Sequence, residues 1–128
     1  STTNLPPAQT RLALQSLDRA KQLMQEKNDE GALSELQTVL SNDPTLAEAH
    51  FLRGQILQRR NEIEAALNAY SAAIYWNPRM SAGHLALAKL YLGRGDRTRA
   101  ASHAKLTLEI EPQNQDALAI KRQLEMNK

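Results

Sequence analysis

Cysteine is absent from this chain of 128 residues, which excludes a disulfide scaffold and a thiolate metal site. Aromatic residues are scarce, with one Phe, one Trp and three Tyr. Valine and isoleucine together number six, against 19 alanines and 20 leucines. Sheets pack through β-branched and aromatic side chains, so this composition argues against a strand-rich fold. A hydrophobic content of 41% with 23% charged residues is typical of a globular chain, and we predict an all-α domain.

Long apolar runs and a strong net charge are also missing. No stretch approaches the roughly 20 apolar residues of a membrane span. A formal net charge of +2 is too small to imply a polyanionic partner by itself. The first residue is Ser1, so we expect a processed or excised chain. We expect a soluble protein, cytoplasmic or periplasmic, and the composition leaves its compartment unknown.

A 34-residue period is the strongest positive feature of the sequence. Pro44, Pro78 and Pro112 recur at this period. The residues 12 and 24 positions before each proline are small: Ala32, Ala66, Ala100, Ala20, Gly54 and Ala88. Apolar residues at helical spacing between these markers indicate two helices per period. One such hairpin cannot bury its apolar face alone, so the pattern predicts a stack of hairpins.

Local signals mark the helix boundaries. Each proline breaks a second helix, because its ring prevents the helix from continuing. Thr45 and Asn61 are each followed three residues later by a glutamate, which is the pattern of an N-terminal capping box. Gly95 and Asp96 are suited to ending one helix and starting the next. We therefore expect helix N-caps at Thr45, Asn61 and Asp96.

These residues closely resemble the motif of the tetratricopeptide repeat family, in which small residues and a proline recur in the same order. The resemblance implies a right-handed α-solenoid of three helix-turn-helix repeats with a seventh helix as a cap. The expected segments are a flexible tether at 1–7, repeats at 8–46, 47–80 and 81–114, and the capping helix at 115–128.

The resemblance also implies that the first helix of each repeat lines a concave groove. By position, the groove residues are Leu17, Lys21, Met24, Phe51, Leu52, Gln55, Arg59, Leu85, Lys89 and Leu92. They form an apolar, mildly basic floor, which suits a partner peptide or helix with apolar anchors and some negative charge. The alternative is that several of these leucines belong to the core, because the helix register can slip by one residue.

One subclass of the family grips the acidic C-termini of chaperones through a carboxylate clamp of polar and cationic side chains. The corresponding positions here are Leu17, Lys21, Leu52, Leu85 and Lys89. Three leucines replace polar donors, so we predict that this chain does not bind chaperone tails.

Four arginines fall near the turns inside the second and third hairpins: Arg59, Arg60, Arg94 and Arg97. Together on one edge of the solenoid they would bind an anionic polymer. The alternative is ordinary solvated turns, with arginine stems covering apolar surface. We favour that alternative and do not expect nucleic acid, because no interleaved aromatic residues offer base stacking.

The histidines do not form a metal-ligand pattern. His50 and His84 occupy equivalent positions in successive repeats, about 10 Å apart on the scale of helix packing. That separation is too large for one shared metal ion, and His103 has no obvious partner. No paired carboxylates, phosphate loop or nucleophile with a base falls where this fold would make a pocket. We expect no metal, no cofactor and no catalysis.

The leading functional interpretation is a non-catalytic interaction module that binds a partner protein in the groove. One alternative is a structural segment of a longer scaffold or homo-oligomer. Tyr75, expected on an exposed face of its helix, is a candidate contact for such self-association. The other alternative is an anionic-polymer binder that uses the arginine edge.

Overall fold

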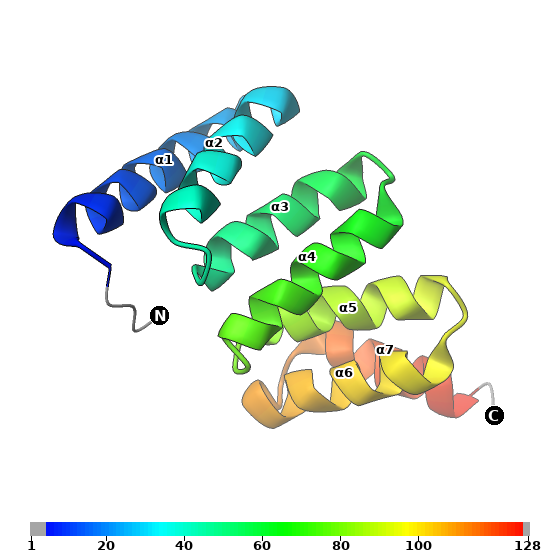
Figure 1. Ribbon diagram of the computed structural model, residues 1–128. Coiled ribbons are helices and arrows are strands. Elements are labelled where there is room, and N and C mark those ends of the chain that lie inside the picture. Colours follow the sequence, from blue (N-terminus) through cyan, green and yellow to red (C-terminus); the bar gives the residue numbers. More distant parts are fainter. Residues whose placement is uncertain (1–4, 127–128) are drawn as a thin grey trace. The chain divides into compact units, whose positions relative to one another are not determined.

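The computed structural model describes residues 5–126, and within that range the chain forms seven helices and no strand (Figure 1). The helices are α1 (Pro7–Gln25), α2 (Asp29–Asn42), α3 (Ala47–Arg59), α4 (Ile63–Trp76), α5 (Ser81–Gly93), α6 (Arg97–Ile110) and α7 (Gln115–Met126). The predicted all-α class is confirmed. Helix α1 begins one residue before the expected start, whereas residues 1–4 of the expected tether and 127–128 of the expected cap lie outside the described range.

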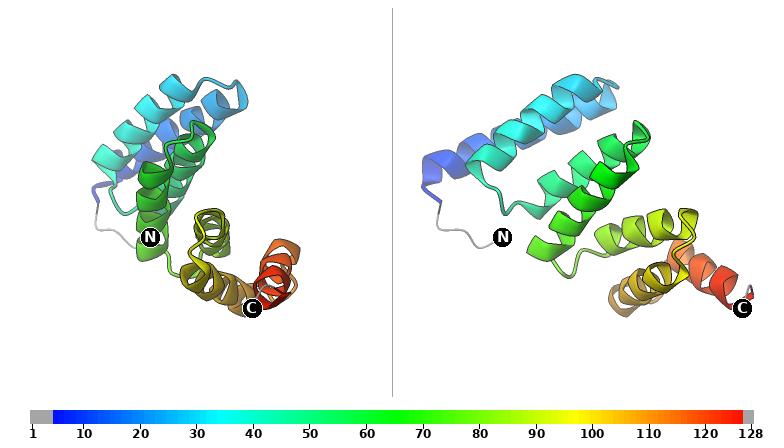
Figure 2. Two further views of the ribbon diagram at one scale, coloured as in Figure 1. Left: turned by 90° about the vertical axis from the view of Figure 1, so that its right-hand side faces the viewer. Right: turned by 45° about the vertical axis from the view of Figure 1, so that its right-hand side comes forward.

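The chain divides into two compact units between Asn77 and Pro78. The first unit holds two antiparallel hairpins, α1 with α2 and α3 with α4 (Figure 2). Its core contains Ala13, Leu17 and Ala20 of α1, Ala32, Leu36 and Val39 of α2, and Ala49 and Ile56 of α3. Small residues at the helix crossings let the backbones approach closely, and the larger residues fill the space beside them.

The second unit contains the α5–α6 hairpin and α7, which packs against both of these helices. Its core is formed by Ala88 of α5, Ala100 and Ala104 of α6, and Ile120 and Leu124 of α7. Helix α7 therefore takes the place of a further first helix on the end of the last hairpin.

The turn inside each hairpin has one residue in the left-handed conformation. These residues are Lys27, Asn61 and Gly95, with φ angles of 63°, 63° and 79°, and they recur at the same period as the prolines. The next amide donates to the carbonyl five residues back: Asn28 to Leu23 at 2.9 Å, Glu62 to Leu57 at 2.8 Å, and Asp96 to Tyr91 at 2.9 Å. A hydrogen bond that closes a turn of six residues is the signature of a Schellman motif, which satisfies a carbonyl at the helix end.

Only one of the three expected N-caps is confirmed. The Asp96 carboxylate accepts a hydrogen bond from the Arg99 amide at 3.1 Å and begins α6. The prediction for Asn61 is wrong, because its left-handed backbone belongs to the end of α3, and Glu62 precedes α4 without a side-chain cap bond.

The expected cap at Thr45 is also wrong. Helix α3 follows Leu46, and the Thr45 hydroxyl instead donates to Oδ1 of buried Asp43 at 2.7 Å. An N-cap that the sequence patterns did not reveal is Asn28, whose side chain accepts from the Gly31 amide at 2.9 Å.

Candidate binding surface on the first helices

The first-helix face of unit 1 contains both core and accessible residues. Leu17 is only 4% exposed and belongs to the core, while Met24 and Leu52 are half-buried against that core. Phe51 is half-buried, and its ring centroid lies 5.5 Å from that of Tyr70 on α4. Gln55 is exposed. The accessible part of this face therefore lies toward the C-terminal ends of α1 and α3.

A hollow of about 490 Å³ opens at that place, lined by Met24, Gln55, Gln58, Arg59 and Tyr70. Met24, Gln55 and Arg59 were expected in the groove, and Gln58 lies at another position that the resemblance assigns to it. The structure adds Tyr70. A flexible thioether, two amides, a guanidinium and a phenol provide apolar surface together with hydrogen-bonding groups of both kinds.

Tyr70 lies beneath the hollow and is only 2% exposed. Its hydroxyl donates to Oε1 of Gln58 at 2.7 Å, and burial raises the pKa of Tyr70 to about 12. The ring lies over Gly54 of α3, where an added Cβ would stand 2.7 Å from ring carbons. Gly54 therefore lets the ring reach the first-helix face, and the Gln58 amide is oriented by its bond to the phenol.

The expected cations of this face have acidic partners. Nζ of Lys21 lies 2.7 Å from Glu48 on α3, and Arg59 is paired with Asp29 at the start of α2. These pairs are partly exposed, so each contributes about 0–1 kcal/mol to stability. Their main effect is to reduce the basic character that the lysine and arginine give to the surface.

The corresponding face of unit 2 lies on α5. Leu85 and Leu92 are half-buried against the core of that unit, and Lys89 is exposed. Nζ of Lys89 lies 2.8 Å from Oδ2 of Asp116 on α7. This pair repeats the Lys21–Glu48 pair, since each of its members lies two repeat periods further along the chain.

The four arginines of the proposed anionic edge are divided between the units. In unit 1, Arg60 contacts Glu30 at 2.8 Å and Glu62 at 3.1 Å, in addition to the Arg59–Asp29 pair. In unit 2, Arg97 donates to the carbonyl of Leu124 at 2.6 Å. Arg94 lies near the Asp96 carboxylate. Each of these guanidinium groups thus has a neighbour within the chain.

The histidines are held by the loops that carry the periodic prolines. Nε2 of His50 lies 2.9 Å from the carbonyl of Pro44, and Nε2 of His84 lies 2.8 Å from that of Pro78. His84 also contacts His103, with 3.2 Å between their Nδ1 atoms. Within residues 5–126, no three histidine or carboxylate side chains gather in a way that would hold a metal ion.

Aromatic rings are also exposed at the end of α4. Tyr75 is 73% exposed and Trp76 is 43% exposed, and the two rings meet edge to face with centroids 4.9 Å apart.

None of the helices that the structure describes is long and apolar enough to cross a membrane.

Comparison with known proteins agrees with this architecture. Residues 47–80 match the family model described as a tetratricopeptide repeat, and these are the residues expected for the second repeat. The chain has the tetratricopeptide-repeat fold. The predicted resemblance is thus confirmed, and the fold is one that generally serves as a non-catalytic scaffold for protein–protein interaction. A comparison of the sequence with curated proteins finds no significant match.

Solved tetratricopeptide domains superpose closely on the chain. The Arabidopsis OM64 domain gives a TM-score of 0.85 at 13% identity, covering 94% of this chain and 99% of its own. The first such domain of Spaghetti (RPAP3), bound to the HSP90 peptide SRMEEVD, gives 0.83 at 15% identity over 91% and 95% of the two chains. MamA gives 0.76 at 25% identity over 82% of this chain, which spans 61% of MamA. At such low identities, the likeness to the first two establishes the fold alone.

Proposed function

We propose that this chain is a non-catalytic interaction module that binds a partner peptide or helix on the first-helix face of its repeats. The observation that carries the proposal is the hollow between the ends of α1 and α3, where Met24, Gln55 and Arg59 meet Gln58 and Tyr70. Leu17 is buried, so it supports the surface and does not anchor the ligand. The anchors of the partner are apolar side chains that contact Met24 and the stems of Gln55 and Arg59.

The partner is not strongly acidic. Lys21, Arg59 and Lys89 are each paired with a carboxylate of this chain, so an anionic ligand would have to displace Glu48, Asp29 or Asp116. The exposed amides of Gln55 and Gln58 remain to orient the ligand through hydrogen bonds. A moderately polar peptide with one or two apolar anchors suits this surface.

The same contacts argue against chaperone tails as ligands. The positions of a carboxylate clamp hold buried Leu17, half-buried Leu52 and Leu85, and two lysines that already have acidic partners. We expect the peptide SRMEEVD, which the RPAP3 domain binds, to show no saturable binding to this chain.

A peptide-display selection against the immobilised chain, followed by fluorescence polarisation with the recovered peptides, tests the proposal. Gln55→Trp fills the hollow from an exposed position, and Gln37→Trp makes the same change on the exposed face of α2. We expect Gln55→Trp to weaken binding at least about tenfold, which corresponds to about 1.4 kcal/mol, and Gln37→Trp to leave it unchanged.

Failure to recover any saturable peptide, or binding that is unaffected by Gln55→Trp, would overturn the proposal. Binding that survives Gln55→Trp and falls steeply with salt would instead support the arginine edge as an anionic-polymer site.

A further inference from the structure

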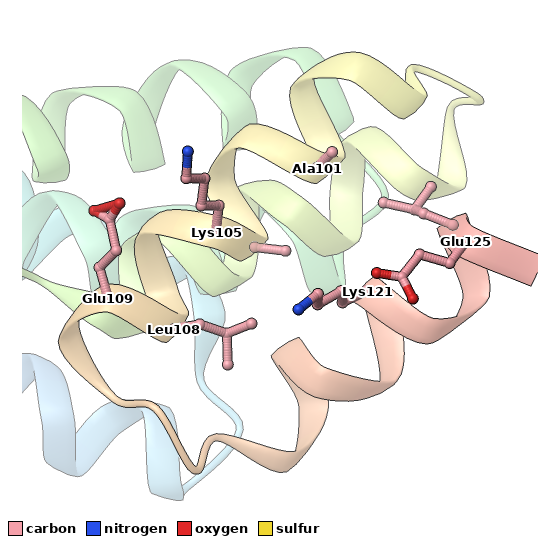
Figure 3. Close-up of a pocket in the computed structure, with 8 residues that line it drawn as sticks. Ala101, Lys105, Leu108, Glu109, Lys121 and Glu125 are labelled. Atoms are coloured by element: carbon pink, nitrogen blue, oxygen red, sulfur yellow. The ribbon is translucent and has the colours of Figure 1, made fainter.

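A second surface of the molecule, distinct from the first-helix face, lies in unit 2. Between α6 and α7 is an open hollow of about 540 Å³ (Figure 3). Its floor is apolar and consists of Ala101, Ala104 and Leu108 of α6 and Leu124 of α7. Apolar surface that is left open in this way favours an apolar occupant.

The rim of this hollow carries two lysines and two glutamates, Lys105 and Glu109 on α6 and Lys121 and Glu125 on α7. In Figure 3, Glu109 and Glu125 lie toward opposite ends, with the lysines between them. None of the four forms an ion pair with another residue of the described chain, whereas Lys89 and Asp96 in the same unit are both paired. The rim therefore presents a negative–positive–negative pattern without partners.

A comparison with the equivalent place in unit 1 shows how the α6–α7 hollow differs from its counterpart. The equivalent hollow, two repeat periods earlier, is lined by Leu33, Gln37, Leu40, Ser41, Arg53 and Leu57. There Leu57 of α3 is only 5% exposed, and α4 packs against α3. The residue equivalent to Leu57 is Glu125 of α7, which is exposed, and α7 has no following helix among the described residues. The α6–α7 hollow thus has an exposed glutamate where its counterpart has a buried leucine, so a helix of another molecule can reach it from the α7 side.

Helix α1 presents a surface with the complementary pattern. Leu12 and Leu14 are each 49% exposed, although Ala13 and Leu17 beside them are buried. Arg11, Leu14 and Asp18 have the spacing i, i+3, i+7 and so lie on one face of the helix. Arg11 and Asp18 are exposed, and neither forms an ion pair within the described range. The face is positive, apolar and negative in turn.

We propose that α1 of one copy docks into the α6–α7 hollow of a second copy of this chain. Leu14 then lies on Leu108 and Leu124, Asp18 faces the rim lysines, and Arg11 faces one of the rim glutamates. The contact joins two different surfaces, so it leaves a free hollow at one end and a free α1 at the other, and association continues head to tail. One helix in one groove makes a small interface, and the association is therefore weak and concentration-dependent.

The test is sedimentation velocity of the full chain at concentrations from about 10 μM to about 1 mM, where weak interfaces of this size are populated. The mean mass of the native chain should rise with concentration. Leu14→Glu and Ala101→Glu alter exposed positions on the two sides of the contact, and each variant should remain monomeric. Leu106→Glu introduces the same charge on α6 outside the hollow and should behave as the native chain.

An experiment that mixes two variants distinguishes this head-to-tail association from any symmetric dimer. Leu14→Glu keeps an intact hollow and Ala101→Glu keeps an intact α1, so an equimolar mixture should form dimers and nothing larger. The charge-reversed variant Lys105→Glu/Lys121→Glu should lose association, and adding Asp18→Lys should restore it. A native chain that stays monomeric throughout the range, or association that survives both single variants, would overturn the proposal. Loss of association in Tyr75→Ser, with native association in Ala101→Glu, would contradict the proposal and place the contact at the end of α4.

Discussion

The Nδ1 atom of His84 lies 3.2 Å from the Nδ1 atom of His103, while Nε2 of His84 lies 2.8 Å from the carbonyl oxygen of Pro78. A carbonyl only accepts, so Nε2–H of His84 is the donor there, and Nδ1 of a neutral His84 is an acceptor. The network thereby assigns the donor role in the histidine pair to Nδ1–H of His103. A second proton on His84 would place two N–H groups against each other. The pair therefore accommodates at most one positive charge without breaking a bond.

Acidification should destabilise the α5–α6 hairpin through this pair. Burial lowers the pKa of His103 below its usual value, and the nearby His84 ring lowers it further. The Tyr91 ring stacks on His103, and the Arg99 guanidinium lies over the Tyr91 ring, so neither side chain offers a carboxylate to stabilise an imidazolium. A histidine whose pKa is lower in the folded chain than in the unfolded chain binds its proton more tightly in the unfolded chain. Its contribution to stability is full above the unfolded pKa of about 6.5 and is lost as the pH falls through the folded pKa.

Urea unfolding followed by circular dichroism between pH 8 and pH 5 measures this effect. The native midpoint should fall across that window, and His103→Gln should show a smaller fall. His50→Gln is the control for loss of a histidine outside the pair, because Nε2 of His50 contacts a proline carbonyl as that of His84 does. Bonding to Arg99 lowers the pKa of Asp96 below its usual acidic range, so that group titrates outside the window. Equal slopes for the native chain and His103→Gln would contradict the assignment.

The left-handed turn residues give a second prediction. Lys27 and Gly95 occupy equivalent turns, but only glycine adopts a positive φ without a steric penalty. Lys27→Gly should raise the free energy of unfolding by about 0.5–1 kcal/mol, and Gly95→Ala should lower it by about 1 kcal/mol. No atom lies within 4 Å of a Cβ built on Gly95, so the change there isolates the backbone effect. Lys27→Ala is the control for loss of the side chain; stabilisation equal to that of Lys27→Gly would refute the backbone explanation.

The fold could be predicted from the sequence because its signals are local and periodic. Three evenly spaced prolines and the small residues before them specify where hairpins form and where helices cross. The N-caps were less predictable. Asn61 is as well suited to a left-handed position as to an N-cap, and only the Schellman bond from Glu62 to Leu57 shows which role it takes.

The binding surface was only partly predictable, since position in a repeat does not reveal the neighbours of a side chain. Tyr70 comes from a second helix and reaches the hollow because Gly54 has no side chain beneath it. The Lys21–Glu48 pair depends on the register between α1 and α3. Its recurrence as Lys89–Asp116, two repeat periods later, is a sequence signal that could have revealed both partners.

The buried phenol gives a third prediction. The pKa of Tyr70 is raised to about 12 by burial, so this side chain should remain neutral at pH 11 while the chain is folded. Ultraviolet difference titration at 295 nm measures tyrosinate directly. The native chain and Tyr70→Phe should give the same absorbance change up to about pH 11, and an additional tyrosine should appear only in the native chain above that pH. A difference between the two chains near pH 10 would show that the Tyr70 hydroxyl is accessible to water.

The contact between Gly54 and Tyr70 gives the fourth prediction. Gly54→Ala places a methyl group 2.7 Å from Cδ1 and Cε1 of Tyr70, whose ring is held by Phe51 and by the bond to Gln58. The ring must shift, and overpacking of this kind costs about 1–3 kcal/mol of unfolding free energy. Gly93→Ala makes the same change in a helix with no atom within 4 Å of the added Cβ, and it should be neutral or stabilise by up to about 1 kcal/mol. Because the displaced ring lies beneath the hollow, Gly54→Ala should also weaken the peptides that Gln55→Trp weakens. A variant that loses stability yet binds these peptides with native affinity would remove Tyr70 from the binding surface.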